Sequence, residues 1–307
     1  MAERVIPAGL DVAFHVNAAL PGHDDPRLSA LLDAVAELGY RRVVLPPLGL
    51  ADIDAGAVRA AFDERGLVAV PMAGQNPEAD VSSVDPWVRE AGAKAIRDAI
   101  ELAARLGSDR VGGVPYGAFG RPAEPVARDA WRRSAAAVGL AAEEAFERGV
   151  SMTIEVLNRY ETAMMNTAEQ AMAYVEESGS EHLLIHLDTF HMAIEERDTA
   201  AAIRTAMPRL GYIELGQSGR GMLSTGSVDV PAVVRGALDA GYTGRWGVEA
   251  FSAQLLPEPA QQALAIWRPA YRDGTVLAAD AARIIAAGHA SHLAERTGAA
   301  ASGTGQD

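Results

Sequence analysis

The sequence predicts an α/β protein with a (β/α)₈ TIM-barrel architecture, and three observations support this fold class. Short β-rich runs alternate with longer segments of helical periodicity, through eight cycles and without a break in composition. Several of the helical segments end in a glycine just before the next strand. The first predicted strand, residues 10–15, is not followed by the glycine-rich phosphate loop that is common at this place in an open doubly wound sheet.

Each predicted strand is a short and mostly apolar run. The eight strands are expected at residues 10–15, 42–45, 68–71, 110–114, 151–156, 183–187, 211–215 and 246–250. The clearest helices are expected at residues 26–38, 85–106, 127–148, 167–177 and 230–240. The last helical stretch, 257–296, is longer than one barrel helix requires.

The helix ends and the chain length fit a single barrel domain. Glycine closes a helix in a left-handed conformation without steric cost, and it follows several predicted helices. These glycines are Gly39, Gly66, Gly107, Gly149 and Gly241. The 307 residues lie within the range of one barrel. We expect one domain over residues 1–295 and a disordered tail over 296–307, where small and polar residues dominate.

The composition excludes several classes of protein. The chain has 27 basic and 41 acidic residues, a net charge of −14 and no basic patch, so we expect no nucleic-acid partner. Because cysteine is absent, a metal ion would need oxygen or imidazole ligands. The N-terminus lacks the pattern of a secretory signal, and no run reaches roughly 18 uninterrupted apolar residues. We therefore expect a cytoplasmic protein without a membrane partner.

Acidic residues stand at the carboxyl ends of the last four predicted strands, where barrels of this class carry their active sites. They are Glu155, Asp188, Glu214 and Glu249. An unpaired carboxylate in such an apolar run is costly, and a bound cation would remove that cost. Oxygen ligands favour a hard ion such as Mg²⁺ or Mn²⁺. The alternative is that each carboxylate is neutralised separately by its own salt bridge or hydrogen bonds.

Three stretches of the sequence resemble the ketose 3-epimerases, the D-tagatose and D-psicose 3-epimerases of the xylose isomerase-like barrel superfamily. The stretches are 154–161 (IEVLNRYE), 166–171 (NTAEQA) and 187–196 (LDTFHMAIEE). Weaker similarity extends from about residue 10 to about residue 285. The resemblance implies an isomerase of carbohydrate metabolism. It also implies a homo-oligomer, because relatives are often dimers or tetramers.

The resemblance further implies the roles of individual residues. A Mn²⁺, Mg²⁺ or Co²⁺ ion would be bound by Glu155, Asp188, the residue at position 214 and Glu249. The two glutamates among these, Glu155 and Glu249, would be the catalytic acid and base that transfer the proton at C3 of a ketose. Three further residues would bind the substrate oxygens around C1 to C3. They are Glu161, His191 and Arg220.

The chain departs from the family pattern on the seventh strand. The family motif reads His-x-Gly-Glu with the histidine on the metal, whereas residues 214–217 read Glu-Leu-Gly-Gln. A glutamate in the histidine's place adds one negative charge, which raises the pKa of a catalytic glutamate or tightens the hold on the cation. Segments 43–47 and 114–119 also depart from the family. We interpret the chain as a divergent member whose substrate differs.

The leading hypothesis is a metal-dependent sugar isomerase or epimerase that transfers a proton at C3 of a ketose or related keto-sugar through an enediolate. One alternative is a lyase-type subunit that uses the same chemistry to cleave 3-oxo-glycosides, including C-glycosides. Another is a sugar-binding barrel without turnover. Among the remaining histidines, we expect His186 to be a hydrogen-bonded core residue, and we leave open whether His15 lines the pocket.

Overall fold

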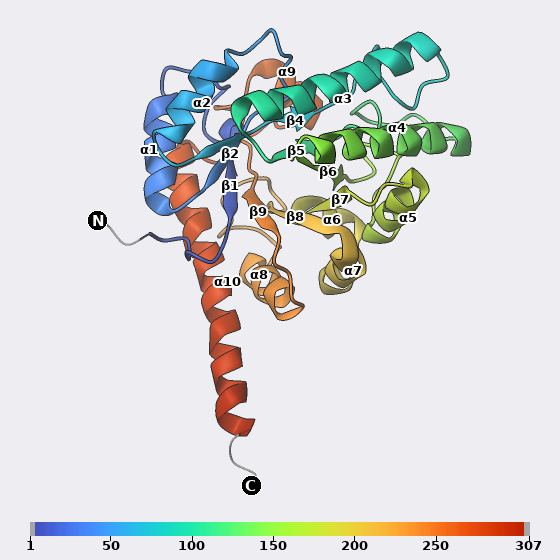
Figure 1. Ribbon diagram of the computed structural model, residues 1–307. Coiled ribbons are helices and arrows are strands. Elements are labelled where there is room, and N and C mark those ends of the chain that lie inside the picture. The colour runs from blue at the N-terminus through green and yellow to red at the C-terminus, as the bar shows by residue number, and fades with distance from the viewer. Residues whose placement is uncertain (1–3, 304–307) are drawn as a thin grey trace.

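Parallel strands form a curled sheet that is surrounded by helices (Figure 1). The computed structural model describes residues 4–303 of the chain. The order of the strands in the sheet is β3-β2-β1-β9-β8-β7-β6-β5-β4. Their bounds are β1 (Val12–His15), β2 (Arg42–Val44), β3 (Val68–Val70), β4 (Met72–Ala73), β5 (Arg110–Gly113), β6 (Ser151–Val156), β7 (Leu183–Asp188), β8 (Leu210–Leu215) and β9 (Arg245–Val248). All eight predicted strands are confirmed.

The third barrel strand is divided by a proline into β3 and β4. Pro71 has no N–H, but its carbonyl still accepts a hydrogen bond from the backbone N–H of Gly112 in β5, at 3.3 Å. The preceding carbonyl, of Val70, accepts from Leu45 after β2, at 2.9 Å. The strand therefore pairs with β2 on one side and with β5 on the other, which brings the two ends of the sheet together as a barrel.

Helices follow the strands and cover the outside of the barrel (Figure 1). Their bounds are α1 (Leu28–Leu38), α2 (Ala55–Asp63), α3 (Pro86–Leu106), α4 (Arg128–Glu147), α5 (Ala168–Ser178), α6 (Thr189–Glu195), α7 (Thr199–Ala206), α8 (Val230–Asp239), α9 (Glu258–Leu264) and α10 (Gly274–Gly303). Two short 3₁₀ turns, η1 (Val16–Ala18) and η2 (Met207–Arg209), complete the list. The five predicted helices are confirmed to within two residues at each end. The five glycines predicted to close helices, Gly39, Gly66, Gly107, Gly149 and Gly241, have φ between +64° and +101°.

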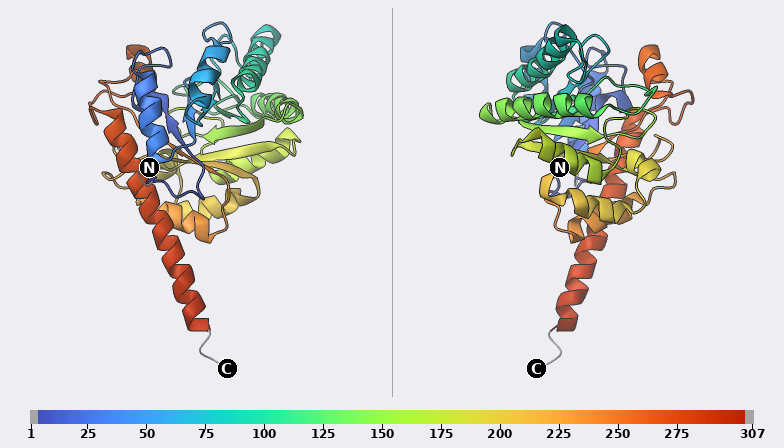
Figure 2. Two further views of the ribbon diagram at one scale, coloured as in Figure 1. Left: turned by 60° about the vertical axis from the view of Figure 1, so that its left-hand side comes forward. Right: turned by 90° about the vertical axis from the view of Figure 1, so that its right-hand side faces the viewer.

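The prediction of one helical stretch over 257–296 is wrong, because two helices occupy it. Helix α9 ends at Leu264, and the next residue, Ala265, takes a left-handed conformation with φ +54°. Helix α10 begins at Gly274, packs against α1 and α8, and extends beyond the barrel (Figure 2). It overlaps the segment 296–307 for which we expect a tail, and residues 304–307 of that segment lie outside the described residues. The tail stays a prediction.

Salt bridges connect the amino ends of the strands. Arg42 at the start of β2 contacts Asp11 at 3.0 Å and Asp109 at 2.7 Å. Arg245 at the start of β9 contacts the same two carboxylates. Oppositely charged groups thus neutralise one another at this end of the barrel, and the acids predicted to be functional lie at the other end.

Among the described residues, no helix combines the length and the apolar character needed to cross a membrane.

Two helical glycines provide a matched test of the packing. A Cβ on Gly139 of α4 would lie 2.4 Å from the backbone oxygen of Ser178, whereas one on Gly236 of α8 would meet no atom within 4 Å. We expect Gly139→Ala to lower the free energy of unfolding by about 1–3 kcal/mol through overpacking. Gly236→Ala should raise it by about 0.5–1 kcal/mol, because alanine favours the helix. Urea denaturation of both variants measures this, and shifts of the same sign would contradict the packing described.

Candidate active site

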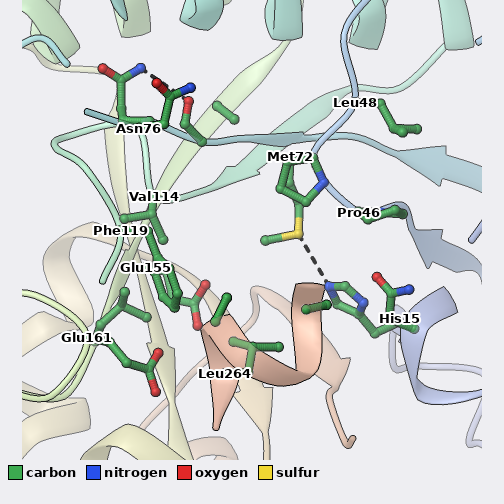
Figure 3. Close-up of a pocket in the computed structure, with 18 of the residues that line it drawn as sticks. His15, Pro46, Leu48, Met72, Asn76, Val114, Phe119, Glu155, Glu161 and Leu264 are labelled. Carbon is green, nitrogen blue, oxygen red and sulfur yellow. Dashed lines mark hydrogen bonds between the residues drawn. The ribbon is translucent and has the colours of Figure 1, made fainter. Parts of the chain in front are cut away.

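A cavity of about 550 Å³ opens at the carboxyl ends of the strands (Figure 3). One part of its wall is polar and the other part is apolar. The polar side chains include His15, Glu155, Glu161, His191, Arg220 and Glu249. The apolar side chains include Pro46, Leu48, Met72, Val114, Phe119 and Leu264. Both segments that depart from the family pattern, 43–47 and 114–119, therefore contribute to the cavity wall.

The four predicted acids are all buried, but only two of them line the cavity. Glu155 near the end of β6 and Glu249 directly after β9 line the cavity. Asp188 at the end of β7 and Glu214 in β8 do not line it and are 0% and 3% exposed. Asp188 and Glu214 are partners in the parallel register of their strands. The structure thus brings the four acids to one end of the barrel.

Glu249 is neutralised by a buried arginine. The guanidinium of Arg220 directly contacts the Glu249 carboxylate, and it lies 3.5 Å from Oε1 of Glu161. Burial alone would raise the pKa of Glu249, but Arg220 and the neighbouring histidines together more than offset this, so that the pKa is lowered. Nε2 of His15 lies 3.7 Å from the same carboxylate. Glu249 is therefore an anion with a partner.

Arg220 is held by its backbone and by two aromatic rings. Its φ of +54° is unusual for a residue other than glycine, and such conformations concentrate at functional sites. The guanidinium carbon lies 4.0 Å from the ring centre of Phe190 and 5.0 Å from that of Phe251. The backbone carbonyl of Arg220 also accepts from the N–H of Phe251, at 2.7 Å. The arginine that the sequence places near the substrate is thus fixed against Glu249.

Asp188 has one oxygen in use and one free. Its Oδ1 accepts from the backbone N–H of Phe190, at 2.7 Å, and so caps helix α6. Its Oδ2 is buried and has no hydrogen-bond partner in the described part of the chain. Burial, together with the charge of Glu249, raises the pKa of Asp188 well above its ordinary value. An unpartnered carboxylate oxygen inside the protein is expensive unless a cation occupies the site.

Glu155 and Glu214 have similar electrostatic surroundings. Burial raises the pKa of each to about 7, and the negative charge of Glu249 adds to both shifts. Glu214 Oε2 lies 3.2 Å from Nε2 of His186, and its Oε1 accepts a long hydrogen bond from the hydroxyl of Tyr212, at 3.4 Å. Neither carboxylate has an arginine or lysine within salt-bridge distance among residues 4–297.

His191 is a hydrogen-bond donor toward the cavity. Its Nδ1 accepts from the backbone N–H of Asn158, at 3.1 Å, so the proton of the neutral ring is on Nε2. Burial lowers the pKa of His191 to about 3, and the ring is neutral at pH 7. Nε2 lies 3.5 Å from Oε1 of Glu155 and 3.8 Å from Oδ2 of Asp188. A protonated nitrogen cannot bind a metal ion, and this position suits an oxygen of a substrate instead.

His186 differs from what the sequence predicts. It is buried as expected, with 2% exposure, but neither of its ring nitrogens has a hydrogen-bond partner within the described residues. The prediction of a hydrogen-bonded core histidine is therefore wrong. Its position two residues before Asp188 on β7 was the available signal, because alternate residues of a strand share a face. His15 does line the cavity, and its Nε2 lies 3.3 Å from the sulfur of Met72 (Figure 3).

The buried ligand atoms fit a divalent cation. Two groups have potential ligand atoms within 4.8 Å of one another: one is Glu155, Asp188 and His191, and the other is Glu155, His186 and Glu214. In the first group the two carboxylates are the ligands, because Nε2 of His191 carries a proton. The free Oδ2 of Asp188 and the absence of arginine or lysine at Glu155 and Glu214, among the residues described, leave negative charge that a cation would balance. Glu249 belongs to neither group, and its carboxylate is engaged by Arg220.

The chain is a parallel α/β barrel with acids and imidazoles buried at its carboxyl end. Residues 32–270 match the xylose isomerase-like TIM barrel family. An L-ribulose 3-epimerase of Mesorhizobium japonicum is 35% identical over 261 residues, which are 85% of this chain and 88% of that protein. A ketose 3-epimerase of Arthrobacter globiformis is 38% identical over 245 residues, 80% of this chain and 85% of that protein.

The solved structures agree with these relatives. A structure of L-ribulose 3-epimerase superimposes with a TM-score of 0.90 at 32% identity and covers 97% of this chain and 100% of that one. The chain therefore belongs to the ketose 3-epimerases of the xylose isomerase-like barrel family, and it is a sugar epimerase. The family resemblance stated from the sequence is confirmed.

Binding of a divalent cation should stabilise the protein measurably. A cation at 100 times its Kd adds about 2.7 kcal/mol to the free energy of unfolding. We expect the Tm to rise with Mn²⁺, relative to NaCl of equal ionic strength. Asp188→Asn should reduce this rise, because asparagine keeps the cap on α6 but lacks the charge.

Asp198→Asn is the matched control for that experiment. Asp198 caps α7 through the N–H of Ala201, at 3.0 Å, and is exposed. The Mn²⁺-dependent rise in Tm should be unchanged in this variant. An equal loss in both variants, or no response of the unmodified protein to Mn²⁺, would contradict the cation site.

Proposed function

We propose that this protein epimerises a free ketose at C3. One observation carries the proposal: two glutamates line the same cavity from different sides of the barrel. Glu155 comes from β6 and Glu249 follows β9, and β7 and β8 lie between these strands in the sheet. A sugar bound between the two carboxylates exposes opposite faces of one carbon to them, as inversion of that carbon by proton transfer requires.

The residues of the cavity would have different roles in such a reaction. One glutamate removes the proton from C3 and the other returns a proton to the opposite face. Arg220 keeps Glu249 anionic and in place, and the Nε2–H of His191 donates to an oxygen of the sugar. Glu161, which lies 3.5 Å from Arg220, accepts from a sugar hydroxyl. These roles follow the predicted assignment of catalytic and substrate-binding residues.

A divalent cation belongs to this proposal. Glu155, Asp188 and Glu214 supply the carboxylates that would bind it, and Glu155 shares one group of neighbouring ligand atoms with Asp188 and another with Glu214. When bound, the cation supplies Lewis-acid polarisation of the C2 carbonyl, which makes the proton at C3 more acidic. Oxygen ligands suit Mn²⁺ or Mg²⁺. A cytoplasmic location and a dimer or tetramer remain predictions from the sequence.

The names of the relatives and the shape of the cavity indicate the substrate class. The similar proteins are an L-ribulose 3-epimerase and a ketose 3-epimerase, and a further relative is a D-psicose 3-epimerase of Agrobacterium fabrum, 29% identical over 227 residues. A cavity of about 550 Å³ accommodates a monosaccharide. Its apolar wall would pack against the C–H groups of the sugar carbons that lie away from the carboxylates. We therefore propose a pentulose or hexulose as substrate.

Exchange of deuterium tests the reaction itself. Mn²⁺-loaded protein incubated with D-fructose, D-tagatose and L-ribulose in D₂O should place one deuteron at C3 of at least one sugar and of its epimer. Proton NMR follows the loss of the H3 signal. If H3 persists in all three sugars while calorimetry shows that a sugar binds, the chain is a sugar-binding barrel without turnover, and the proposal fails.

Replacement of the two glutamates tests their roles. Glu155→Gln and Glu249→Gln should each slow the exchange at C3 by about 10²–10⁴-fold, the usual contribution of a catalytic acid or base. Glu177→Gln is the control, because this exposed glutamate pairs with Arg128 on the outer helices. Full activity in either cavity variant would contradict the assignment of that residue.

A further inference from the structure

The cavity extends beyond the groups that the proposed reaction uses. Its outer part is lined by the loop after β2, by helix α3 and by helix α9. The side chains from these elements include Pro46, Leu48, Ala95, Ala99, Ala263 and Leu264. We call the part that these six residues line the outer compartment. Figure 3 shows Leu48 across the cavity from Glu161, which lies at the inner part.

The volume of the cavity exceeds what a simple sugar fills. The twelve non-hydrogen atoms of a hexulose would occupy about 360 Å³ even if each took up the ~30 Å³ of a water molecule in the liquid. The cavity measures about 550 Å³. Volumes of about 300–1,000 Å³ are typical of sites for drug-sized ligands. A free hexulose bound at the two glutamates therefore leaves the outer compartment unfilled.

Unpartnered hydrogen-bonding groups lie in the inner part of the cavity. Oε2 of Glu161 and Nε2 of His191 are buried and have no partner in the described part of the chain. The amide of Gln75, by contrast, donates to the carbonyl of Gly92 at 3.1 Å and accepts from the N–H of Val81 at 2.9 Å. The other polar side chains of the wall also have protein partners already, and these are Asn17, Asn76 and Asp98. The outer compartment thus favours apolar groups over hydroxyls.

The charges of the wall disfavour a phosphate in the outer compartment. Arg220 is the one arginine or lysine among the described residues of the wall, and it already contacts Glu249. Asp98 of α3 also lines the cavity, and its carboxylate is paired with Lys94 at 2.5 Å. A phosphate in the outer compartment would therefore lose hydration without gaining a free cationic partner.

We propose that the substrate is a ketose with a neutral, apolar substituent on its terminal oxygen remote from C1, such as an alkyl or aryl ether at O6 of a hexulose. The substituent occupies the outer compartment while the C1 to C3 end lies at the two glutamates. Pro46 belongs to segment 43–47, which departs from the family pattern, so this part of the wall differs from that of the family. The inference rests on the proposed function, because it names the substrate of the same site.

Calorimetry of the Mn²⁺-loaded protein with four ligands tests the proposal. We expect 6-O-benzyl-D-fructose to bind about 10–100-fold more tightly than D-fructose, because its ring is buried as a phenylalanine side chain is in a protein core. The isomer 1-O-benzyl-D-fructose and D-fructose 6-phosphate should bind no more tightly than D-fructose. Equal affinity for D-fructose and its 6-O-benzyl ether, or an equal gain with both benzyl isomers, would overturn the proposal.

Two variants of helix α9 locate the subsite. Ala263 lines the outer compartment and is exposed, so Ala263→Trp fills this space and should abolish the preference for 6-O-benzyl-D-fructose over D-fructose. Gln262→Trp is the matched control, because Gln262 is exposed on the same helix and is not among the residues that line the cavity. A preference that persists in Ala263→Trp, or that both variants lose equally, contradicts the assignment. The ligand comparison on the unmodified protein decides the matter if Ala263→Trp does not fold, which circular dichroism would reveal.

Deuterium exchange at C3 with the same ligands separates this inference from the proposed function. Exchange in a free ketose, without tighter binding of 6-O-benzyl-D-fructose, overturns the outer compartment as a subsite and leaves the proposed function intact. Tighter binding of the ether, without exchange in any ligand, supports the subsite and overturns the proposed function.

Discussion

The burial of several carboxylates at one end of a barrel is the constraint on which the site depends. Glu155, Asp188 and Glu214 are nearly inaccessible to water, and each has a raised pKa because burial penalises its charge. Of the four acids, Glu249 is the one that forms a salt bridge with Arg220 among the described residues. Buried acids without a partner lower the free energy of unfolding, and binding of a cation or a proton removes this destabilisation.

The barrel imposes this convergence through its parallel register. Successive strands carry Glu155 opposite His186 and Asp188 opposite Glu214, so that two layers of polar side chains face the interior. The salt bridges of Arg42 at the other end show the usual way of keeping charge in a barrel, with a partner for each group. The amino end of the barrel, with its paired charges, therefore stabilises the fold, whereas the carboxyl end carries the reactive groups.

The fold and the four acids follow from local patterns, because apolar runs, terminal glycines and strand-end carboxylates are visible within a few residues of sequence. Three features of the structure could not be predicted from such local patterns. The pairing of Arg220 with Glu249 joins a loop to a strand end and needs a left-handed arginine. The proton position on His191 depends on the backbone of Asn158. The break between α9 and α10 rests on the conformation of Ala265, a residue that ordinarily continues a helix.

Helix α10 has a practical consequence for handling the protein. Helix α9 contributes Leu264 to the cavity wall, whereas the far end of α10 emerges at the opposite end of the molecule (Figure 1). A support or fluorophore joined beyond Gly303 would therefore stand clear of the entrance used by sugars. Immobilised catalyst particles anchored in this way would present every cavity outward to the flowing solution.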